Sequence, residues 1–95
     1  MSDSIQQQET ASAGSFFFEE GGRRLAEMTY SRTNAALIIV DHTEVDASLS
    51  GQGVGRRLLD ALVRWARATN TKVIALCPYA KAQFDKDTSI RDVLA

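Results

Sequence analysis

Apolar and polar positions follow different patterns in successive stretches of this chain, and these patterns predict its elements. Residues 1–13 are rich in Ser, Gln and Thr with few large apolar side chains, so they predict a disordered tail. Residues 16–19 open with three phenylalanines and predict a short strand, which a Gly-Gly turn joins to a second, alternating strand at 24–31. Residues 35–40 form a continuous apolar run that predicts a strand covered on both faces, extended through 41–45. We expect this third strand to be the central one.

A helix and a fourth strand follow a glycine-rich loop. After the loop at 51–55, residues 58–66 are mostly apolar with a narrow polar stripe, which predicts a well-packed helix. Residues 72–76 predict a buried strand, and residues 80–86 predict a short helix with a proline near its first turn. A strand, a helix and a strand in succession form a right-handed crossover between parallel strands. The predicted fold class is therefore α/β (α+β), a mixed sheet of three antiparallel strands and one parallel strand with helices on both faces, in a single domain over residues 14–95.

The loop before the helix has the chemistry of an anion site. Gly51, Gly53 and Gly55 stand at alternate positions, so the loop can curl with its N–H groups pointing inward. The first N–H groups of the helix that follows have no partner within the helix, and such a terminus commonly holds a phosphate. Arg56 and Arg57 lie in the first helical turn, where a cation opposes the helix dipole. A bound anion would reverse the local field; two solvated arginines on an exposed face are the alternative.

Composition limits the classes of function. The chain has 95 residues, and its single cysteine excludes an internal disulfide. Its net charge of −1 argues against a nucleic-acid binder. Residues 1–50 carry eight acids and three bases, whereas residues 51–72 carry five bases and one acid. The basic segment coincides with the glycine loop, which favours a small phosphorylated ligand. No apolar run is long enough to span a membrane, and the polar N-terminus lacks the apolar stretch typical of a signal peptide. We therefore expect a cytoplasmic protein with no membrane partner and no metal.

Two common phosphate-binding motifs do not fit the loop. A Walker A loop ends in Gly-Lys-Ser/Thr, whereas Arg56 and Arg57 follow Gly55. The dinucleotide-binding fingerprint requires a third glycine where Arg56 stands, and it opens the first crossover of a larger domain. The sequence therefore disfavours an NTPase and a dinucleotide-binding enzyme.

Three short segments, in this order and spacing, carry a specific resemblance: His42-Thr43-Glu44-Val45, Gly51-Gln52-Gly53-Val54-Gly55 and Cys77-Pro78-Tyr79-Ala80. With the order of predicted elements, they resemble the Gcn5-related N-acetyltransferase (GNAT) superfamily over residues 16–86, and especially its very small single-domain members. The resemblance implies a minimal GNAT-like fold, acetyl-CoA or another acyl-CoA as the cofactor, and an amine of unknown identity as the acceptor. It implies an N-acetyltransferase. We expect a monomer or weak dimer. A non-catalytic CoA-binding or regulatory module and a structural interaction domain are the alternatives.

The resemblance also assigns a cofactor site. The diphosphate would lie against the backbone N–H groups of residues 52–56, with charge-assisted contacts from one of the two arginines. The pantetheine arm would follow the edge of the third strand and carry the thioester to the cysteine. The expected cofactor-binding residues are Glu44, Val45, Gly51, Gln52, Gly53, Val54, Gly55, Arg56, Arg57, Cys77, Tyr79 and Phe84.

The residues that would move protons match the superfamily less closely. Many members carry a tyrosine that protonates the departing CoA thiolate, and its position holds Phe84 here. Cys77 or Tyr79 would take over the role of this tyrosine as the acid. Cys77 has other possible roles: it would accept the acyl group, contact the thioester, or be a buried structural cysteine. His42 and Glu44 are the candidate bases, and the sequence does not rank them. The catalytic candidates are therefore Cys77, His42 and Glu44.

Overall fold

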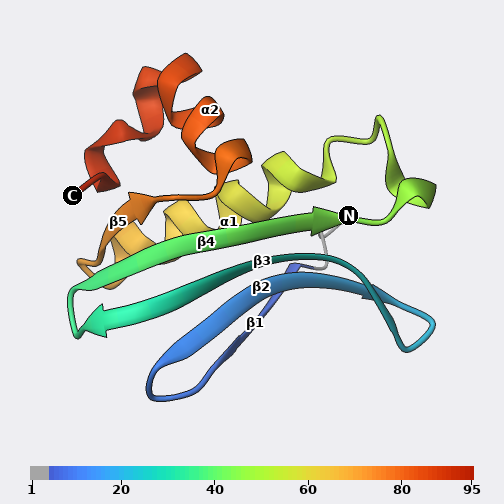
Figure 1. Ribbon diagram of the computed structural model, residues 1–95, viewed down its shortest axis with the longest axis horizontal. Helices are drawn as coiled ribbons and strands as arrows, with labels where there is room; N and C mark the ends of the chain where they lie inside the picture. The colour runs from blue at the N-terminus through green and yellow to red at the C-terminus, as the bar shows by residue number, and fades with distance from the viewer. Residues whose placement is uncertain (1–4) are drawn as a thin grey trace.

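The computed structural model describes residues 5–95, which form one five-stranded sheet with two α-helices (Figure 1). The elements in chain order are β1 (Ile5–Glu9), β2 (Ala13–Glu20), β3 (Arg23–Asn34), β4 (Leu37–Val45), the 3-10 helix η1 (Ala47–Leu49), α1 (Val54–Ala68), β5 (Lys72–Ala75), α2 (Pro78–Lys86) and the 3-10 helix η2 (Thr88–Val93). Strands β1 to β4 are antiparallel neighbours, and β5 pairs with β4 in parallel through the α1 crossover. The predicted fold class, a mixed α/β sheet, is confirmed. No helix in residues 5–95 is long and apolar enough to cross a membrane.

The prediction of a disordered tail is wrong for residues 5–13, which the structure describes. Within the predicted tail, 1–13, residues 5–9 form β1, which pairs with β2 from Ile5↔Phe18 to Glu9↔Gly14. Residues 1–4 of that tail lie outside the described part of the chain. The sheet therefore has four antiparallel strands rather than three, and it begins before residue 14.

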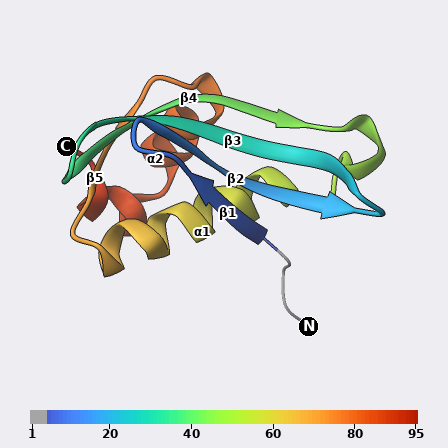
Figure 2. The same ribbon diagram turned by 90° about the horizontal axis from the view of Figure 1, so that it is seen from below.

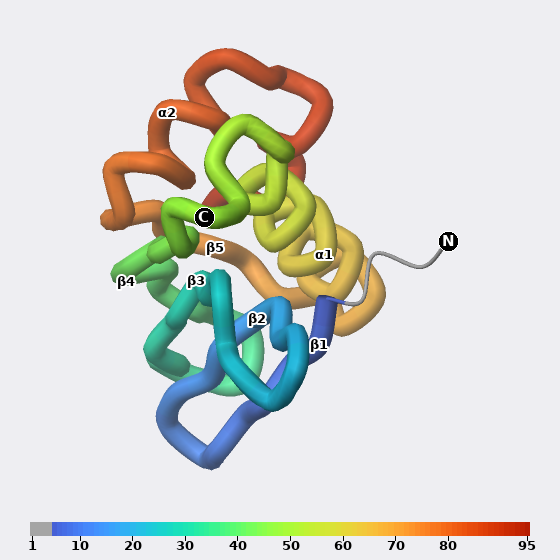
Figure 3. The backbone as a smooth tube through the Cα atoms, turned by 90° about the vertical axis from the view of Figure 1, so that its right-hand side faces the viewer, coloured from blue at the N-terminus to red at the C-terminus, as the bar shows by residue number. Residues whose placement is uncertain are grey.

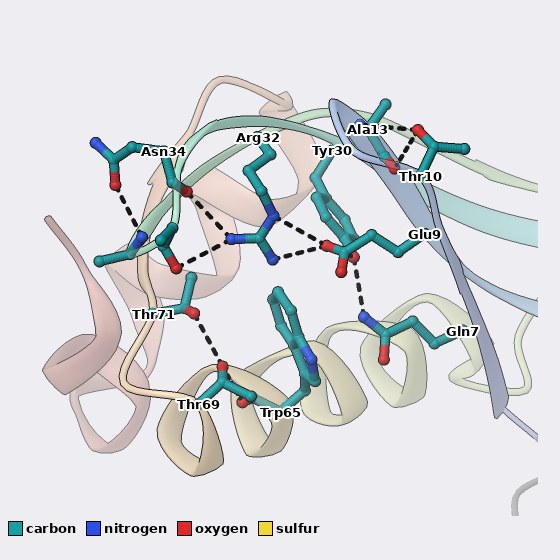
Figure 4. Close-up of polar contacts among 12 residues, drawn as sticks. Gln7, Glu9, Thr10, Ala13, Tyr30, Arg32, Asn34, Trp65, Thr69 and Thr71 are labelled. Carbon is teal, nitrogen blue, oxygen red and sulfur yellow. Dashed lines mark hydrogen bonds and ion pairs between the residues drawn. The ribbon is translucent and has the colours of Figure 1, made fainter.

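Polar side chains anchor β1 to β3 (Figure 4). Glu9 accepts hydrogen bonds from Tyr30 Oη at 2.9 Å and from Arg32 Nη2 at 2.7 Å, and Gln7 donates to Tyr30 Oη at 2.9 Å. The Arg32 guanidinium lies 5.5 Å from the ring centroid of Trp65 in α1. Burial opposes ionisation of Glu9, but the hydrogen bonds from Arg32 and Tyr30 outweigh it and lower the pKa of Glu9. Burial raises the pKa of Tyr30 to about 12. The hydropathy pattern does not predict β1, because the side chains that anchor this strand are polar.

Both α-helices pack on the same face of the sheet, which differs from the expected arrangement with helices on both faces (Figures 2 and 3). Met28 of β3, Leu58 of α1 and Phe84 of α2 belong to one buried hydrophobic core. The helices also contact each other directly, because Arg56 Nη1 of α1 donates to Gln83 Oε1 of α2 at 3.0 Å. A chain this short has no further helix in residues 5–95 to cover the second face.

We call the second face of the sheet the open face. Strand register places on it Gln8, Ser15, Glu27, Thr29, Ser31, Ile39 and Ile74. The apolar run at 35–40 predicts cover on both faces, yet Ile39 stays half-buried beside Ile74, which is 36% exposed. The run contains no polar position because the side chains on one face of β4 lie in the core and those on the other face lie beside apolar residues of β5. The middle strand of the sheet is β3 rather than β4.

Candidate functional site

The N-terminus of α1 presents backbone donors. Gly53 caps the helix with φ 70° and ψ 22°, a left-handed conformation that glycine adopts without the strain a Cβ brings. The N–H of Arg57 donates to the Gly53 carbonyl at 3.1 Å and is the first in the helix with a backbone acceptor in residues 5–95. Across the same described range, no acceptor takes the N–H groups of residues 53–56. Four adjacent donors at the positive end of a helix dipole can hold an anion such as a phosphate.

A pocket of about 420 Å³ lies against this helix terminus. The end of β4, the connection through η1, the start of α1 and the start of α2 form its walls. The residues that line it are Thr43, Val45, Asp46, Ala47, Leu49, Ser50, Gly51, Gly53, Val54, Gly55 and Tyr79. The volume suits a small organic ligand or part of a longer one. Six of the expected cofactor-binding residues are among them: Val45, Gly51, Gly53, Val54, Gly55 and Tyr79.

Strands β4 and β5 part beside the pocket. Their parallel pairing ends at Val40↔Ala75. The N–H groups of Leu76 and Cys77 both donate to the Val40 carbonyl, at 3.0 Å each, and the chain then turns into α2. Beyond this point β4 continues to Val45 with no strand of residues 5–95 beside that edge. An extended ligand can form hydrogen bonds along such an edge as an added strand would.

A β-bulge in β4 decides which of its side chains face the pocket. Thr29 of β3 pairs with His42, whereas Tyr30 pairs with Val40, so Asp41 is an extra residue in β4. Asp41 and His42 are both exposed, on the side of Thr29. After the bulge, the alternation of side chains between the two faces of β4 is shifted by one residue, so the side chain of Thr43 lies on the side of the helices.

The two candidate bases lie away from the pocket. His42 pairs with Thr29 and Glu44 pairs with Glu27, so both side chains lie on the open face, and both are exposed. Neither residue lines the pocket. The structure therefore brings the two candidate bases to one face of β4, but it places neither of them in the pocket.

Cys77 lies behind the pocket in contact with a threonine. It is 3% exposed and occupies the N-cap position of α2. Its Sγ lies 3.0 Å from Thr43 Oγ1, and Thr43 lines the pocket whereas Cys77 does not. Thr43 thus connects the thiol to the pocket. Sequence reasoning gave Thr43 no role, because the bulge that turns its side chain toward the helices has no signal in the hydropathy pattern.

Two aromatic residues of α2 are placed differently. Tyr79 lines the pocket, and a Cβ added at Gly55 would lie 3.2 Å from Tyr79 Cζ, so the ring packs closely on the helix terminus. Burial raises the pKa of Tyr79, against the opposing charge of Arg56. Phe84 is 2% exposed in the core and does not line the pocket.

Arg56 is engaged within the protein. Its Nε donates to Asp60 at 2.9 Å, and its other nitrogens contact Gln83 and Asp87 of the α2 segment. Hydrogen bonds from Ser89 and from Arg56 lower the pKa of Asp87 to about 2. These acids explain how a cation is tolerated at the N-terminus of α1 without a bound anion. Neither Arg56 nor Arg57 lines the pocket.

The connection before the helix supplies pocket residues that the sequence did not single out. Asp46 accepts hydrogen bonds from the Ser48 N–H at 2.9 Å and from Ser48 Oγ at 2.6 Å, which fixes the 3-10 turn. The Gln52 N–H donates to the Leu49 carbonyl at 3.2 Å, so this amide, expected to face a diphosphate, has a protein acceptor. The Asp-x-Ser spacing of a side-chain cap is the signal that could have identified this turn.

Comparisons with known proteins agree with this architecture. The sequence profile of the GCN5-related N-acetyl-transferase family matches residues 15–93. The solution structure of a GCN5-like protein from Staphylococcus aureus is 35% identical, covers 99% of this chain and 91% of its own, and superposes with a TM-score of 0.71. No protein with a curated description matches the chain.

Two more distant structures share the fold. A ribosomal-protein-alanine N-acetyltransferase from Brucella melitensis biovar Abortus 2308 is 18% identical over 90% of this chain and 64% of its own, with a TM-score of 0.63. A GNAT family acetyltransferase from Elizabethkingia anophelis, solved with acetyl-CoA bound, is 11% identical over 90% of this chain and 74% of its own, with a TM-score of 0.64. With the family profile matching most of its length, the chain belongs to the GCN5-related N-acetyltransferase family.

Proposed function

We propose that this chain binds acetyl-CoA, or another acyl-CoA, in the pocket beside α1 and transfers the acyl group to an amine. The observation that carries the proposal is the row of N–H groups at residues 53–56, which have no acceptor in residues 5–95 and adjoin a pocket of about 420 Å³. The diphosphate of CoA is an anion that suits such a row, and the amides of pantetheine suit the free edge of β4. Membership of the family supports the same ligand.

The proposed contacts divide along the pocket. Residues 53–56 would bind the diphosphate through their backbone, and Val45 would meet the pantetheine arm at the edge of β4. Arg56 is held by Asp60 and Asp87, so the proposal gives its side chain no contact with the diphosphate. The residues present therefore fit the group through backbone donors more than through side-chain charge.

The chemistry of transfer requires one proton to leave and one to be supplied. When bound, acetyl-CoA supplies an activated acyl group: the amine nitrogen bonds to its carbonyl carbon, the C–S bond breaks, nitrogen loses a proton and the CoA sulfur gains one. The Thr43 hydroxyl can give a proton toward the pocket and take one from the Cys77 thiol 3.0 Å away, and the proton that the amine releases into the pocket can return to this pair through Thr43. Tyr79, whose pKa is raised by burial, is protonated at neutral pH and is the second candidate acid.

A non-catalytic CoA-binding module is the alternative function, and one observation favours it. His42 and Glu44 lie on the open face, while the pocket opens on the helix side. If no group on the pocket side takes the proton of the amine, the chain would bind CoA without turnover.

Titration with CoA is the first test of the proposal. We expect calorimetric binding, and at about 100 times Kd a stabilisation of about 2.7 kcal/mol. A domain of this size shifts its Tm by about 4–8 °C for each kcal/mol, so thermal melting resolves the effect easily. The absence of binding would refute both the acyltransferase and the module.

Release of CoA from acetyl-CoA in the presence of amines is the second test. Thr43→Val keeps the shape of the side chain but removes the hydroxyl beside Cys77, and we expect it to lower turnover about 100-fold with CoA affinity unchanged. Thr33→Val, an exposed position at the far end of β3, is the matched control. CoA binding without release of CoA for any amine would favour the module, and full turnover by Thr43→Val would remove the proposed proton path.

A further inference from the structure

The outer side of β1 is an edge of the sheet with backbone groups to spare. Strand β1 pairs with β2 on one side, and no strand of residues 5–95 lies on the other. The N–H of Thr10 donates to the Ala13 carbonyl at 2.8 Å, so these two residues form a hydrogen-bonded pair. Such pairs alternate with non-hydrogen-bonded pairs along antiparallel strands, so Gln7 and Glu9 direct their N–H and C=O groups away from β2. These groups can pair with a further strand.

The side chains of Gln7 and Glu9 are drawn back from this edge onto β3 (Figure 4). Gln7 Nε2 donates to Tyr30 Oη at 2.9 Å, and Glu9 accepts from Arg32 Nη2 at 2.7 Å. A Cβ on Gly14 would lie 2.5 Å from Tyr30 Cζ, so glycine at this position of β2 lets the ring reach β1. The edge is therefore held in place, and the exposed backbone of β1 is not covered by its own side chains.

Strand β1 lacks the features that usually keep an exposed edge from pairing. Its sequence, Ile5–Glu9, contains no proline and no lysine, and its register with β2 has no bulge. Its one charged residue is Glu9, whose carboxylate forms an ion pair with Arg32. A strand that pairs with β1 therefore meets a neutral edge, which favours a neutral strand as its partner.

The glutamine amides of β1 form a pattern that complements itself. Gln6 and Gln8 lie on the open face, on either side of Gln7. Arg24 Nη2 donates to Gln8 Oε1 at 3.0 Å, so the Gln8 amide keeps its NH₂ group as a donor. Gln6 is exposed, and within residues 5–95 its side chain has no hydrogen-bond partner, so its oxygen can accept. An antiparallel copy reverses this order, so each donor meets an acceptor.

We infer that β1 is an interface between two copies of this chain, which pair antiparallel about a two-fold axis at Gln7. The two Gln7 residues exchange both backbone hydrogen bonds across the axis. Gln6 then lies opposite Gln8 of the second copy in a non-hydrogen-bonded pair, where side chains are closest, and accepts a hydrogen bond from its amide. The symmetry forms this contact twice and joins the two five-stranded sheets into one.

The interface is small, so the dimer is weak. A strand of 5 residues is about 17 Å long, and pairing along its edge buries much less than the roughly 800 Å² per copy of a standard stable interface. We expect a Kd of about 0.1–1 mM. No residue of β1 lines the pocket beside α1, so the inference is independent of the proposed function.

Sedimentation equilibrium of the full chain measures the dimer directly. About half of the chains or more should be dimers at about 1 mM, and most should be monomers at about 20 µM. Gln7→Pro removes the N–H that faces the second copy, whereas β1 keeps its hydrogen bonds to β2 because that N–H points away from β2. Gln7→Thr is the matched control, since it loses the same contact with Tyr30 but keeps the N–H. We expect Gln7→Pro to raise the Kd at least about tenfold and Gln7→Thr to change it less than about twofold.

Two substitutions of Gln6 test the position of the axis and alter no printed contact within the chain. Gln6→Lys sets a donor against the Gln8 donor of the second copy, whereas Gln6→Glu keeps an acceptor there. Gln6→Lys should raise the Kd about fivefold relative to Gln6→Glu. Equal affinities for the two variants would show that the axis does not lie at Gln7.

Two further results would overturn the interface itself. One is a monomeric mass for the unmodified chain at about 1 mM. The other is Gln7→Pro that dimerises as tightly as Gln7→Thr while its ¹⁵N spectrum remains dispersed. If Gln7→Pro does not fold, the comparison of Gln6→Lys with Gln6→Glu decides, because these variants change only an exposed side chain.

Discussion

Substitution of Gly53 by alanine tests whether the conformation of the α1 N-cap creates the anion site. Gly53 has φ 70° and ψ 22°, and a Cβ built on it meets no atom within 4 Å. The substitution therefore introduces no steric clash in the free protein. Its effects arise only from the backbone preference of an L-residue and from whatever ligand occupies the space in front of the helix.

The expected loss of stability follows from that preference. A left-handed conformation costs a residue with a Cβ about 1–2 kcal/mol, and the smaller entropy of an unfolded alanine offsets part of this. We expect the free energy of unfolding to fall by about 1 kcal/mol, which corresponds to a decrease in Tm of about 4–8 °C. The affinity for CoA should fall by about tenfold, because an alanine that relaxes from the left-handed conformation must regain it to present the N–H groups of residues 53–56 to the ligand.

Gly21→Ala is the matched control, because Gly21 lies in the β2–β3 turn with φ 59° and its added Cβ also meets nothing within 4 Å. Urea unfolding of both variants should show similar losses of stability, while calorimetry should show weakened CoA binding only for Gly53→Ala. Equal CoA affinity in the two variants would refute the assignment of the site to the α1 terminus. A Gly53→Ala variant as stable as the unmodified protein would refute the argument from strain.

Two further predictions concern stability. The pKa of Asp87 is about 2 because Ser89 and Arg56 donate hydrogen bonds to it, whereas the unfolded value is near 4. This contribution to stability is complete above about pH 4 and is lost as the pH falls toward 2, so Asp87→Asn should flatten the dependence of Tm on pH in that range; an unaltered profile would contradict the pairing. Tyr30→Phe removes the hydroxyl that bonds Glu9 and should lower the free energy of unfolding by about 1–2 kcal/mol in urea. It should also speed amide exchange in β1, and unchanged exchange would show that the strand is held without this contact.

Much of the fold can be predicted from periodicity, and β1 shows where periodicity fails. Strands β2 to β5 and α1 have apolar faces that recur at the spacing of their elements, so they are visible in the sequence. The segment Ile5–Glu9 has Gln7 and Glu9 at positions that an edge strand would normally fill with apolar side chains. It folds because Tyr30 and Arg32, more than twenty residues away, satisfy those polar groups. No local pattern encodes such a pairing.

The same division applies to the site. Backbone donors at a helix terminus are predictable, because the glycines that shape them are visible in the sequence. The side chains of β4 are not, because the bulge at Asp41 reverses the alternation of every residue after it. Without the bulge, His42 and Glu44 would face the side that Thr43 and Val45 occupy. The sequence favours Arg56 as a phosphate contact for a related reason. Its partner Asp87 lies 31 positions away, so no local pattern shows that the guanidinium is paired within the protein.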